Sequence, residues 1–289
     1  LAPGRIWVAD LESVKVLFRS YDELEDPNKI EKAIERITTG RCIALLPLTE
    51  AAKRTVVRYL GLKDVDIRVI YPTFYTKYSA RFIGERDIVL FVGGSWTNLS
   101  FEAKGGREVC GAWLRIYNDF PEYKFVMLSD PPRDYAERMA RVGARIGPVP
   151  RDVLLTEIYP RTRVIVLPSM MDTVGYSVIE AMNFGAVPIV SDHFAMPELV
   201  GNAGILLRAP TGLWRRDGSF NPVFREELLA GPFDELIEGI ADALHLLLTD
   251  DAFWETLSEK AKYRMKLPPF NIDYRNRSLL EVYIKATQS

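Results

Sequence analysis

The sequence predicts an α/β protein with a parallel sheet, and two observations carry this prediction. From residue 87 onward, patterns typical of strands and helices alternate along the chain. The expected strands are short, continuously apolar runs, as is typical of strands buried on both faces. Strands joined in this way by helices imply right-handed crossovers and a sheet covered on both sides. We therefore expect a Rossmann-like domain over roughly residues 84–208.

The expected elements of this domain follow in order. Helices are expected from the spacing of apolar residues and from the glycines that end them, such as Gly143 and Gly185. The predicted strands are 87–93, 124–129, 163–168, 186–191 and 203–207. The predicted helices beyond residue 150 are those near 151–159, from Tyr176, at 232–248, at 251–265 and at 274–286.

The first 80 residues carry a shorter version of the same pattern. Residues 42–47 resemble a buried strand, and a helix follows with Thr49 as its N-cap and Gly61 as its stop. Residues 67–72 resemble another strand, and residues 11–37 look helical but highly charged.

Three segments of the chain are therefore expected. Residues 1–80 form part of an N-terminal α/β domain, and residues 81–266 form the Rossmann-like domain, with a turn-rich excursion at 209–231. Residues 267–289 form a C-terminal helix that we expect to cross back to the N-terminal domain, although an amphipathic surface helix remains the alternative.

Composition excludes several classes of protein. Apolar residues make up 48% and charged residues 26%, and the formal net charge is −2, so charge-driven binding of nucleic acid is not expected. Cys42 and Cys110 are far apart, and His193 and His245 are the only histidines, which argues against a disulfide or a structural zinc.

The ends and the remaining composition favour a cytoplasmic protein. No apolar run is long enough for a membrane span, and the start LAPGRIWVAD is unlike a signal peptide. It also lacks Met, as expected of a fragment or a trimmed chain. Arg and Glu dominate the charged residues and Gln288 is the only Gln, a composition that favours a thermophile.

The stretch PSMMDTVGYSVIEAMNFG (168–185) is a candidate site, because ligands of open parallel sheets bind beyond the carboxyl ends of the strands. Its helix begins near Tyr176, where free N–H groups and the helix dipole favour phosphate. Glu180, one turn further, suits the hydroxyls of a sugar. Acids and serines are also common at ordinary helix starts, so a nucleotide or sugar-phosphate pocket and a plain capped helix both remain open.

A second loop, GSWTNLSFEAKGG (94–106), follows the strand 87–93 and is expected to face the same pocket. It brings Lys104 and, at the next helix start, Arg107, which would complete a diphosphate cradle. The alternative is a solvated basic loop. The chain contains no GxxxxGK[ST] motif, and VGGSWTN is a poor match to GxGxxG, so neither a P-loop enzyme nor a dinucleotide dehydrogenase gains support.

Taken together, residues 164–207 resemble the donor-binding half of the retaining glycosyltransferase family 4 (glycosyltransferase group 1). The loop FVGG with the later Lys104-Gly105 is similar to the family's phosphate loop, and IRVIYPTF is similar to the end of its N-terminal domain. The matching residues are Pro168-Ser169, Asp172, Glu180-Ala181-Met182, Gly185, Pro188-Ile189, Ser191 and Pro197-Glu198-Leu199-Val200.

The resemblance implies a GT-B fold and transfer of a sugar from a UDP-, GDP- or ADP-sugar, with retention of configuration and without a metal or other cofactor. It implies that Glu180 binds the donor ribose, that Asp172 lies near the sugar hydroxyls and that Lys104 holds the diphosphate. The implied donor-binding residues are Gly94, Arg107, Pro148, Val149, Ser169, Thr173, Val174, Gly175, Tyr176 and Ser177.

The sequence departs from the family pattern at several positions. Asp172 stands where Glu is usual, Gly94 where Arg is usual, and His193-Phe194-Ala195 where glycines are usual. The N-terminal region is also about half the expected length.

Two alternatives therefore stay open, a non-catalytic nucleotide-sugar-binding module that acts with a partner and a sugar-nucleotide epimerase. The acceptor, whether a glycan, a lipid or a small molecule, is not predicted, and neither is the oligomeric state. Peripheral contact with a membrane remains open, and no nucleic-acid partner is expected.

Overall fold

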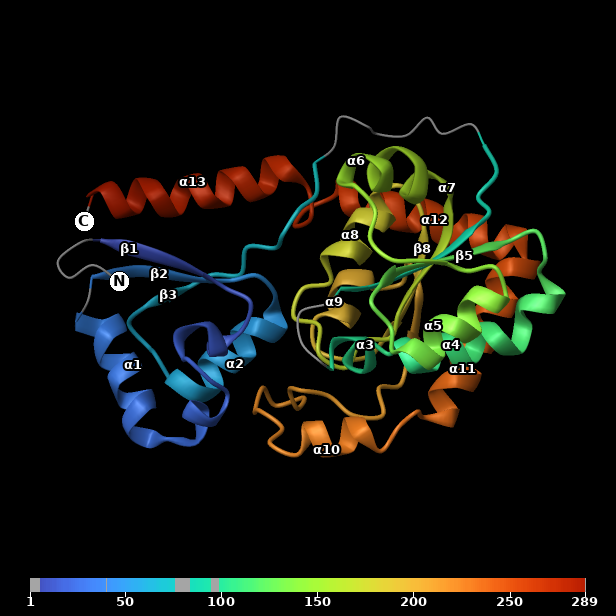
Figure 1. Ribbon diagram of the computed structural model, residues 1–289. Helices are drawn as coiled ribbons and strands as arrows, with labels where there is room; N and C mark the ends of the chain where they lie inside the picture. Colours follow the sequence, from blue (N-terminus) through green and yellow to red (C-terminus); the bar gives the residue numbers. More distant parts are fainter. Residues whose placement is uncertain (1–5, 40, 76–83, 95–98, 289) are drawn as a thin grey trace. The chain divides into compact units, whose positions relative to one another are not determined.

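The structure, a computed structural model, describes residues 6–39, 41–75, 84–94 and 99–288. The chain divides into two compact units, and Figure 1 labels many of their helices and strands. Residues 213–222, although they lie within the range 81–266 in sequence, cluster with the N-terminal residues. The expected boundary between residues 80 and 81 lies outside the described residues. Unit 1 comprises Leu1–Thr73, Leu213–Pro222 and Leu267–Ser289, and unit 2 comprises Phe74–Gly212 and Val223–Lys266.

Unit 2 contains a six-stranded parallel sheet in the order β6-β5-β4-β7-β8-β9. The chain winds outward from the central strand β4 to β6, returns to β7 beside β4, and winds outward again to β9. The reversal between β4 and β7 is the switch point at which open α/β sheets bind ligands. The strands are β4 (Ile88–Gly94), β5 (Lys124–Ser129), β6 (Arg145–Ile146), β7 (Thr162–Leu167), β8 (Val187–Ser191) and β9 (Ile205–Leu207).

The apolar character of these strands follows from where the sheet places them. Every residue of β7 and β8 is buried, and in β4 the segment from Ile88 to Phe91 is buried as well. A parallel sheet with helices on both faces removes both sides of each strand from water, so neither face is free to carry polar residues. The predicted α/β fold with a parallel sheet is confirmed.

Helices cover both faces of this sheet. The crossover from β4 to β5 and the crossover from β7 to β8 run in opposite directions across the sheet, so right-handed connections place α4 and α8 on opposite faces. Helix α4 packs against α11, and α8 packs against α12. The helices of unit 2 are α3 (Ser100–Ala103), α4 (Gly106–Ile116), α5 (Arg133–Arg141), α6 (Arg151–Val153), α7 (Tyr159–Arg161), α8 (Tyr176–Asn183), α9 (Met196–Val200), α10 (Phe224–Leu229), α11 (Asp234–Thr249) and α12 (Asp251–Lys266), with a 3-10 turn at Tyr117–Asp119.

Unit 1 contains a three-stranded parallel sheet in the order β1-β2-β3. Thr49 caps α2 by accepting a hydrogen bond from the backbone N–H of Ala52 at 3.0 Å, and Gly61 ends it in the left-handed conformation. Both predicted caps are therefore confirmed. The elements are β1 (Trp7–Leu11), 3-10 turns at Val14–Leu17 and Asp22–Glu25, α1 (Pro27–Thr39), β2 (Cys42–Pro47), α2 (Glu50–Leu60), β3 (Asp66–Ile67) and α13 (Ile272–Gln288).

The N-terminal region also differs from the sequence expectation. Strand β1 was not expected, because its pattern is only half-buried and carries a charged residue. The predicted strand at 67–72 pairs over only Asp66–Ile67. The expectation of helix over 11–37 is wrong for its first half, where the structure has two short 3-10 turns before α1.

Helix α13 packs on β2 within unit 1. Its residue Val282, 1% exposed, joins a small core with Ala44, Leu46 and Ile70, and Leu279 packs against the same cluster. Burial of one helical side chain against a sheet contributes roughly 2 kcal/mol. The C-terminal residues are therefore part of the hydrophobic core of unit 1.

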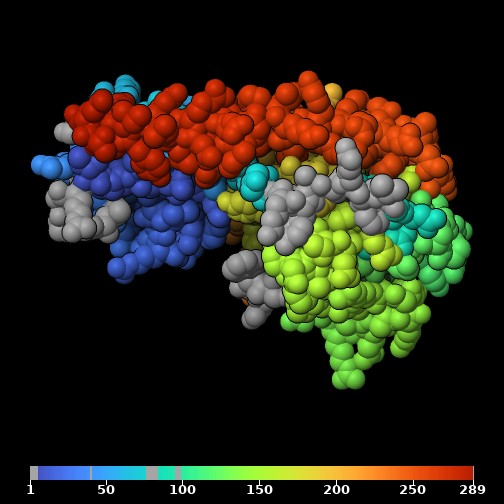
Figure 2. Space-filling view, turned by 90° about the horizontal axis from the view of Figure 1, so that it is seen from above, coloured from blue at the N-terminus to red at the C-terminus, as the bar shows by residue number. Residues whose placement is uncertain are grey.

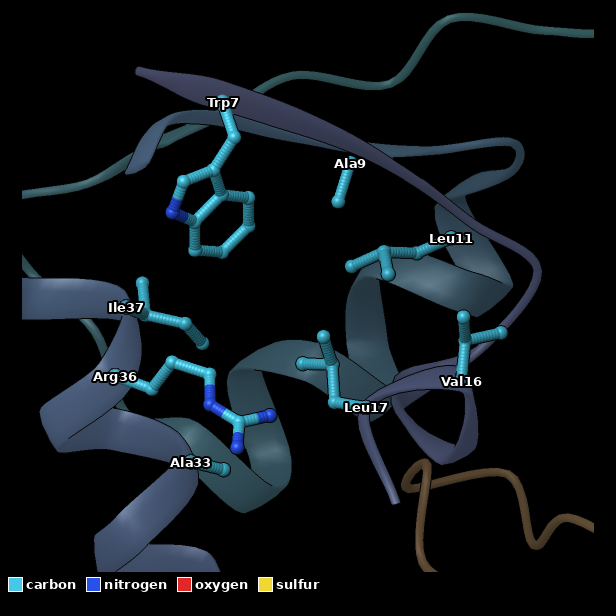
Figure 3. A pocket seen from close by; sticks show the side chains of 8 residues that line it. All are labelled: Trp7, Ala9, Leu11, Val16, Leu17, Ala33, Arg36 and Ile37. Carbon is cyan, nitrogen blue, oxygen red and sulfur yellow. The ribbon is translucent and has the colours of Figure 1, made fainter. Parts of the chain in front are cut away.

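An apolar cavity of about 230 Å³ lies between β1 and α1, and Figure 3 shows its lining. Its lining includes Trp7, Leu11 and Ile37, and among the described residues Arg36 is the one charged residue that lines it. The described part of its lining has no carboxylate with which to bind sugar hydroxyls. Among the described residues, no helix is long and apolar enough to cross a membrane.

Candidate functional site

The candidate site lies where β4 and β7 end, because both strands deliver a loop to the switch point. After β4 the chain passes through α3, Lys104 and Gly105 into α4, and after β7 it passes through Pro168 to Gly175 into α8. The two loops are joined by backbone contacts. The backbone N–H of Met170 donates to the carbonyl oxygen of Ala103 at 2.8 Å, and Ser169 Oγ donates to the same oxygen at 3.3 Å.

Gly105 makes this close approach of the loops feasible. Its φ of +77° lies in the left-handed region, and a Cβ there would lie 2.6 Å from Cγ and 2.8 Å from the carbonyl oxygen of Pro168. No other residue satisfies both conditions without strain. The sequence Lys104-Gly105 thus holds the β4 loop against the start of the β7 loop.

Lys104 and Asp172, 68 residues apart in sequence, form an ion pair across the two loops. Lys104 Nζ lies 2.6 Å from Asp172 Oδ2, and the two side chains are 14% and 15% exposed. Ser169 Oγ accepts from the backbone N–H of Asp172 at 3.0 Å, and Asp172 Oδ1 accepts from that of Gly175 at 3.4 Å. The pair is therefore fixed by the loop itself at the switch point.

Glu180, on the first turns of α8, accepts three hydrogen bonds. Arg151 Nη1 donates to Oε2 at 2.7 Å and Nη2 donates to Oε1. The Tyr159 hydroxyl donates to Oε2 at 2.8 Å. A bidentate guanidinium on a carboxylate is among the stronger polar contacts in proteins. Glu180 is thus held between a cation and a phenol.

Electrostatics keep both of these donors protonated. Burial, and next the charge of Glu180, raises the pKa of the Tyr159 phenol. Hydrogen bonding to Glu180 raises the pKa of the Arg151 guanidinium. Arg151 and Tyr159 therefore both remain hydrogen-bond donors across the neutral pH range.

The helix between Arg151 and Tyr159 contains a π-helical turn at Leu154–Ile158. In a regular α-helix two turns take about seven residues, whereas a π turn accommodates an extra one. Residues eight apart therefore come to the same face. The π turn explains how Arg151 and Tyr159 both reach Glu180.

The remaining residues of the β7 loop surround the start of α8. Gly175 is the N-cap of α8, with φ +67°, and provides no side-chain acceptor. A Cβ at Gly175 would lie 2.6 Å from Met196 Cε. Val174 is buried, Thr173 and Ser177 are partly buried, and Tyr176 is 50% exposed. The loop thus places backbone N–H groups at the positive end of the helix dipole.

Three other predicted residues lie at neighbouring strand ends, and a fourth, Arg107, lies at the start of α4. Gly94 is the last residue of β4, with φ +60°, and Pro148 and Val149 follow β6. Arg107 is directed elsewhere. It is 9% exposed, and its guanidinium donates to the carbonyl oxygens of Leu228 and Gly231. A contact of Arg107 with a diphosphate would require breaking these bonds.

His193 is a residue whose chemistry the sequence did not reveal. It is 7% exposed, and its Nε2 is buried without a hydrogen-bond partner among the described residues. Burial lowers the pKa of His193 to about 4, against the opposing charges of Asp192 and Asp172. Phe194 beside it has a φ of +50°, a conformation that favours the glycine usual at this position in the resemblance.

This shift predicts a loss of stability in acid. Between about pH 6.5 and pH 4 the unfolded chain binds a proton at His193 that the folded chain does not, so the unfolding free energy falls as the pH falls, by about 3 kcal/mol in total. Urea unfolding at pH 4 to 7 checks this when wild type is compared with His193→Gln, because other groups titrate equally in both. Parallel pH curves for the two proteins would contradict it.

Two residues that contact Glu180 were missed by sequence reasoning. Arg151 and Tyr159 lie 29 and 21 residues before it, and both fall in a segment expected only to be helical. Nothing in the local sequence of that segment links either residue to Glu180, since the contacts form between two separate helices on one face of the sheet. Among the described residues, no three His, Cys, Asp or Glu side chains are placed to hold a metal ion.

The chain was compared with protein families and with curated proteins, and one family matches it over the region of the site. Residues 86–214 match the family described as Glycosyl transferases group 1, a range that contains both loops of the site. No curated protein sequence matches the chain significantly.

Solved structures similar to the chain include a sucrose-phosphate synthase from Thermosynechococcus elongatus. It is 20% identical with a TM-score of 0.65, over 98% of this chain and 68% of that one. HepE from Anabaena, in complex with UDP and glucose, is 14% identical with a TM-score of 0.65, over 97% and 72%. The GtfA/B complex is 12% identical with a TM-score of 0.65, over 88% and 48%.

These similarities concern the fold. The chain spans about half the length of some of the structures it matches, 48% for the GtfA/B complex and 46% for TarM. The α/β architecture with parallel sheets is that of GT-B glycosyltransferases, and within it residues 86–214 match glycosyl transferases group 1.

Proposed function

We propose that the chain binds a nucleoside diphosphate sugar at the ends of β4 and β7 and transfers the sugar to an acceptor, with retention of configuration and without a metal. The observation that carries the proposal is the pairing of Lys104 with Asp172 beside the start of α8, with Glu180 one turn along the same helix. A cation, a helix N-terminus and a carboxylate are the groups that a diphosphate attached to a ribose requires.

Each residue has a distinct role in this proposal. The diphosphate lies at the start of α8 and receives Lys104, which neutralises the negative charge that grows on the leaving group in the transition state. Asp172 is then free to accept a hydrogen bond from a hydroxyl of the transferred sugar. Glu180 accepts from the ribose hydroxyls. The departing phosphate takes the proton of the acceptor, so the chain needs no base of its own.

Isothermal titration calorimetry with UDP-, GDP- and ADP-glucose in the presence of EDTA tests the binding step. We expect one of the three to bind with a Kd between about 1 μM and 1 mM. Glu180→Gln removes the charge that holds the ribose and weakens this binding about tenfold. Glu137→Gln, an exposed carboxylate on α5 that also pairs with an arginine, serves as the matched control.

The outcomes separate the alternatives. Absence of binding by all three donors, or equal affinity in Glu180→Gln and wild type, would refute the proposal. Binding without transfer to any acceptor would favour a nucleotide-sugar-binding module that acts with a partner. NMR of the bound donor would reveal epimerisation, the third alternative.

A further inference from the structure

The carboxylate of Glu180 has no room for a ribose as the structure stands. Both of its oxygens accept from Arg151, and Oε2 also accepts from Tyr159. A carboxylate offers about four acceptor positions, and three are in use. The Glu180 side chain is only 14% exposed, so little of its surface is open to a ligand while Arg151 is in place.

The two partners of Glu180 differ in how readily they can leave. Tyr159 is 1% exposed, and its ring stacks against that of Phe184. The Arg151 side chain is 54% exposed and begins the short helix α6, in a segment that Figure 2 shows in yellow-green at the surface of unit 2. Arg151 can therefore swing into solvent, whereas Tyr159 cannot move without opening the core.

Besides its ion pair with Glu180, Arg151 has a weak contact to hold it among the described residues. Its guanidinium lies over the ring of Phe74 at 5.7 Å, a contact of modest strength at an exposed site. Among the described residues, Glu180 is the only ion-pair partner of Arg151. The ion pair therefore holds the guanidinium in place, and a ligand that binds Glu180 in its stead sets Arg151 free.

We propose that Arg151 is an intramolecular competitor of the nucleotide, which occupies Glu180 in the empty site and is displaced by the two ribose hydroxyls. The inference rests on the proposed function, because it takes the ligand to be a ribonucleotide. Two vicinal hydroxyls donate to the two carboxylate oxygens as the two guanidinium N–H groups do. Tyr159 stays on Oε2 and keeps the carboxylate oriented during the exchange.

This competition lowers the affinity of the site. Only molecules in which Arg151 has left Glu180 can bind the ribose. The apparent affinity is therefore the intrinsic affinity multiplied by the fraction of such molecules. The pair also gives Oε1 of this mostly buried carboxylate a donor when no ligand is present, since Tyr159 donates to Oε2, and a buried oxygen without a donor would be unfavourable. Arg151 is thus a positioning residue that determines how much binding the ribose hydroxyls contribute.

Calorimetry with UDP, GDP and ADP and with their 2′,3′-dideoxy analogues tests the inference. Arg151→Gln is expected to bind the preferred ribonucleotide roughly fivefold more tightly than wild type, because an ion pair with one exposed partner no longer has to be broken. The dideoxy analogue lacks the competing hydroxyls and is expected to bind both proteins equally. Arg151→Lys, which makes one contact in place of two, gives an intermediate gain.

Two controls exclude a merely structural effect. Arg133→Gln removes an exposed arginine that is paired with Glu137 at the start of α5 and leaves the nucleotide affinity unchanged. In the Glu180→Gln background, Arg151→Gln gives no further gain, because no carboxylate remains to compete for. Thermal unfolding confirms that each variant is folded.

The contrary outcomes are distinct. If Arg151→Gln binds the ribonucleotide no better than wild type, or gains equally with the dideoxy analogue, the competitor role is refuted and the nucleotide site remains. If wild type binds none of the nucleotides, the proposed function is refuted as well as the inference.

Discussion

Lys104→Met slows the release of nucleoside diphosphate from the bound donor by about 100- to 1000-fold, the usual effect of removing one group that stabilises transition-state charge. The reason is that Lys104 is the cation of the β4 loop at the switch point, held at 2.6 Å from Asp172. The measurement uses the sugar donor identified by calorimetry, with water or an acceptor extract as the second substrate. Donor affinity falls much less than the rate.

Three variants show what Lys104 does. Lys104→Arg keeps the charge and recovers part of the rate. Lys124→Met removes another ion-paired lysine. Lys124 is the first residue of β5, and its Nζ lies 2.8 Å from Asp87, so the pair is at the opposite end of the strands from the site. This substitution leaves the rate unchanged. If Lys104 served only to neutralise Asp172, the double variant Lys104→Met/Asp172→Asn would regain the wild-type rate, and that result would contradict a role on the diphosphate.

Gly105→Ala destabilises the protein by about 3 kcal/mol and lowers its Tm by roughly 10 °C. The alanine must adopt the left-handed backbone conformation of Gly105, which costs roughly 1–2 kcal/mol. It also overlaps with Pro168, at 2.6 Å from Cγ and 2.8 Å from the carbonyl oxygen. Backbone atoms cannot yield cheaply, so the two loops of the site are forced apart. Calorimetric unfolding measures the change.

Gly143→Ala is a matched control, because Gly143 has the same φ of +77° but no atom within 4 Å of the added Cβ. It isolates the conformational cost from the overlap. We expect Gly143→Ala to lower the Tm by about half as much. Equal effects of the two substitutions would show that the contact with Pro168 is unimportant.

The elements that could be predicted from the sequence are those whose burial or capping leaves a pattern in neighbouring residues. The strands β4, β5, β7 and β8 are continuous apolar runs because both faces of the sheet are covered. Thr49 and Gly61 act within one turn of their own helix, so local sequence contains the whole interaction. Strand β1 escaped prediction because it is only half-buried and lacks this pattern.

The site was predictable where topology alone decides it. The parallel strands of one sheet all end at the same edge, so Lys104 and Asp172 were expected to face the same pocket, and the structure brings them into contact. Arg107 shows the limit of this reasoning. Its backbone lies at the start of α4 as expected, but its side chain is bound by carbonyl oxygens more than 120 residues away.

The sequence by itself determined the alternation of strands and helices, the caps, and the loop with Asp172 and Gly175 that leads into the helix of Glu180. Burial period and turn chemistry act over only a few residues, so local sequence contains them. Only the tertiary structure decided which side chains meet. The bidentate grip of Arg151 on Glu180, the phenol of Tyr159 and the buried His193 depend on how separate elements pack. Such contacts depend on distances in space, and those follow from the fold as a whole.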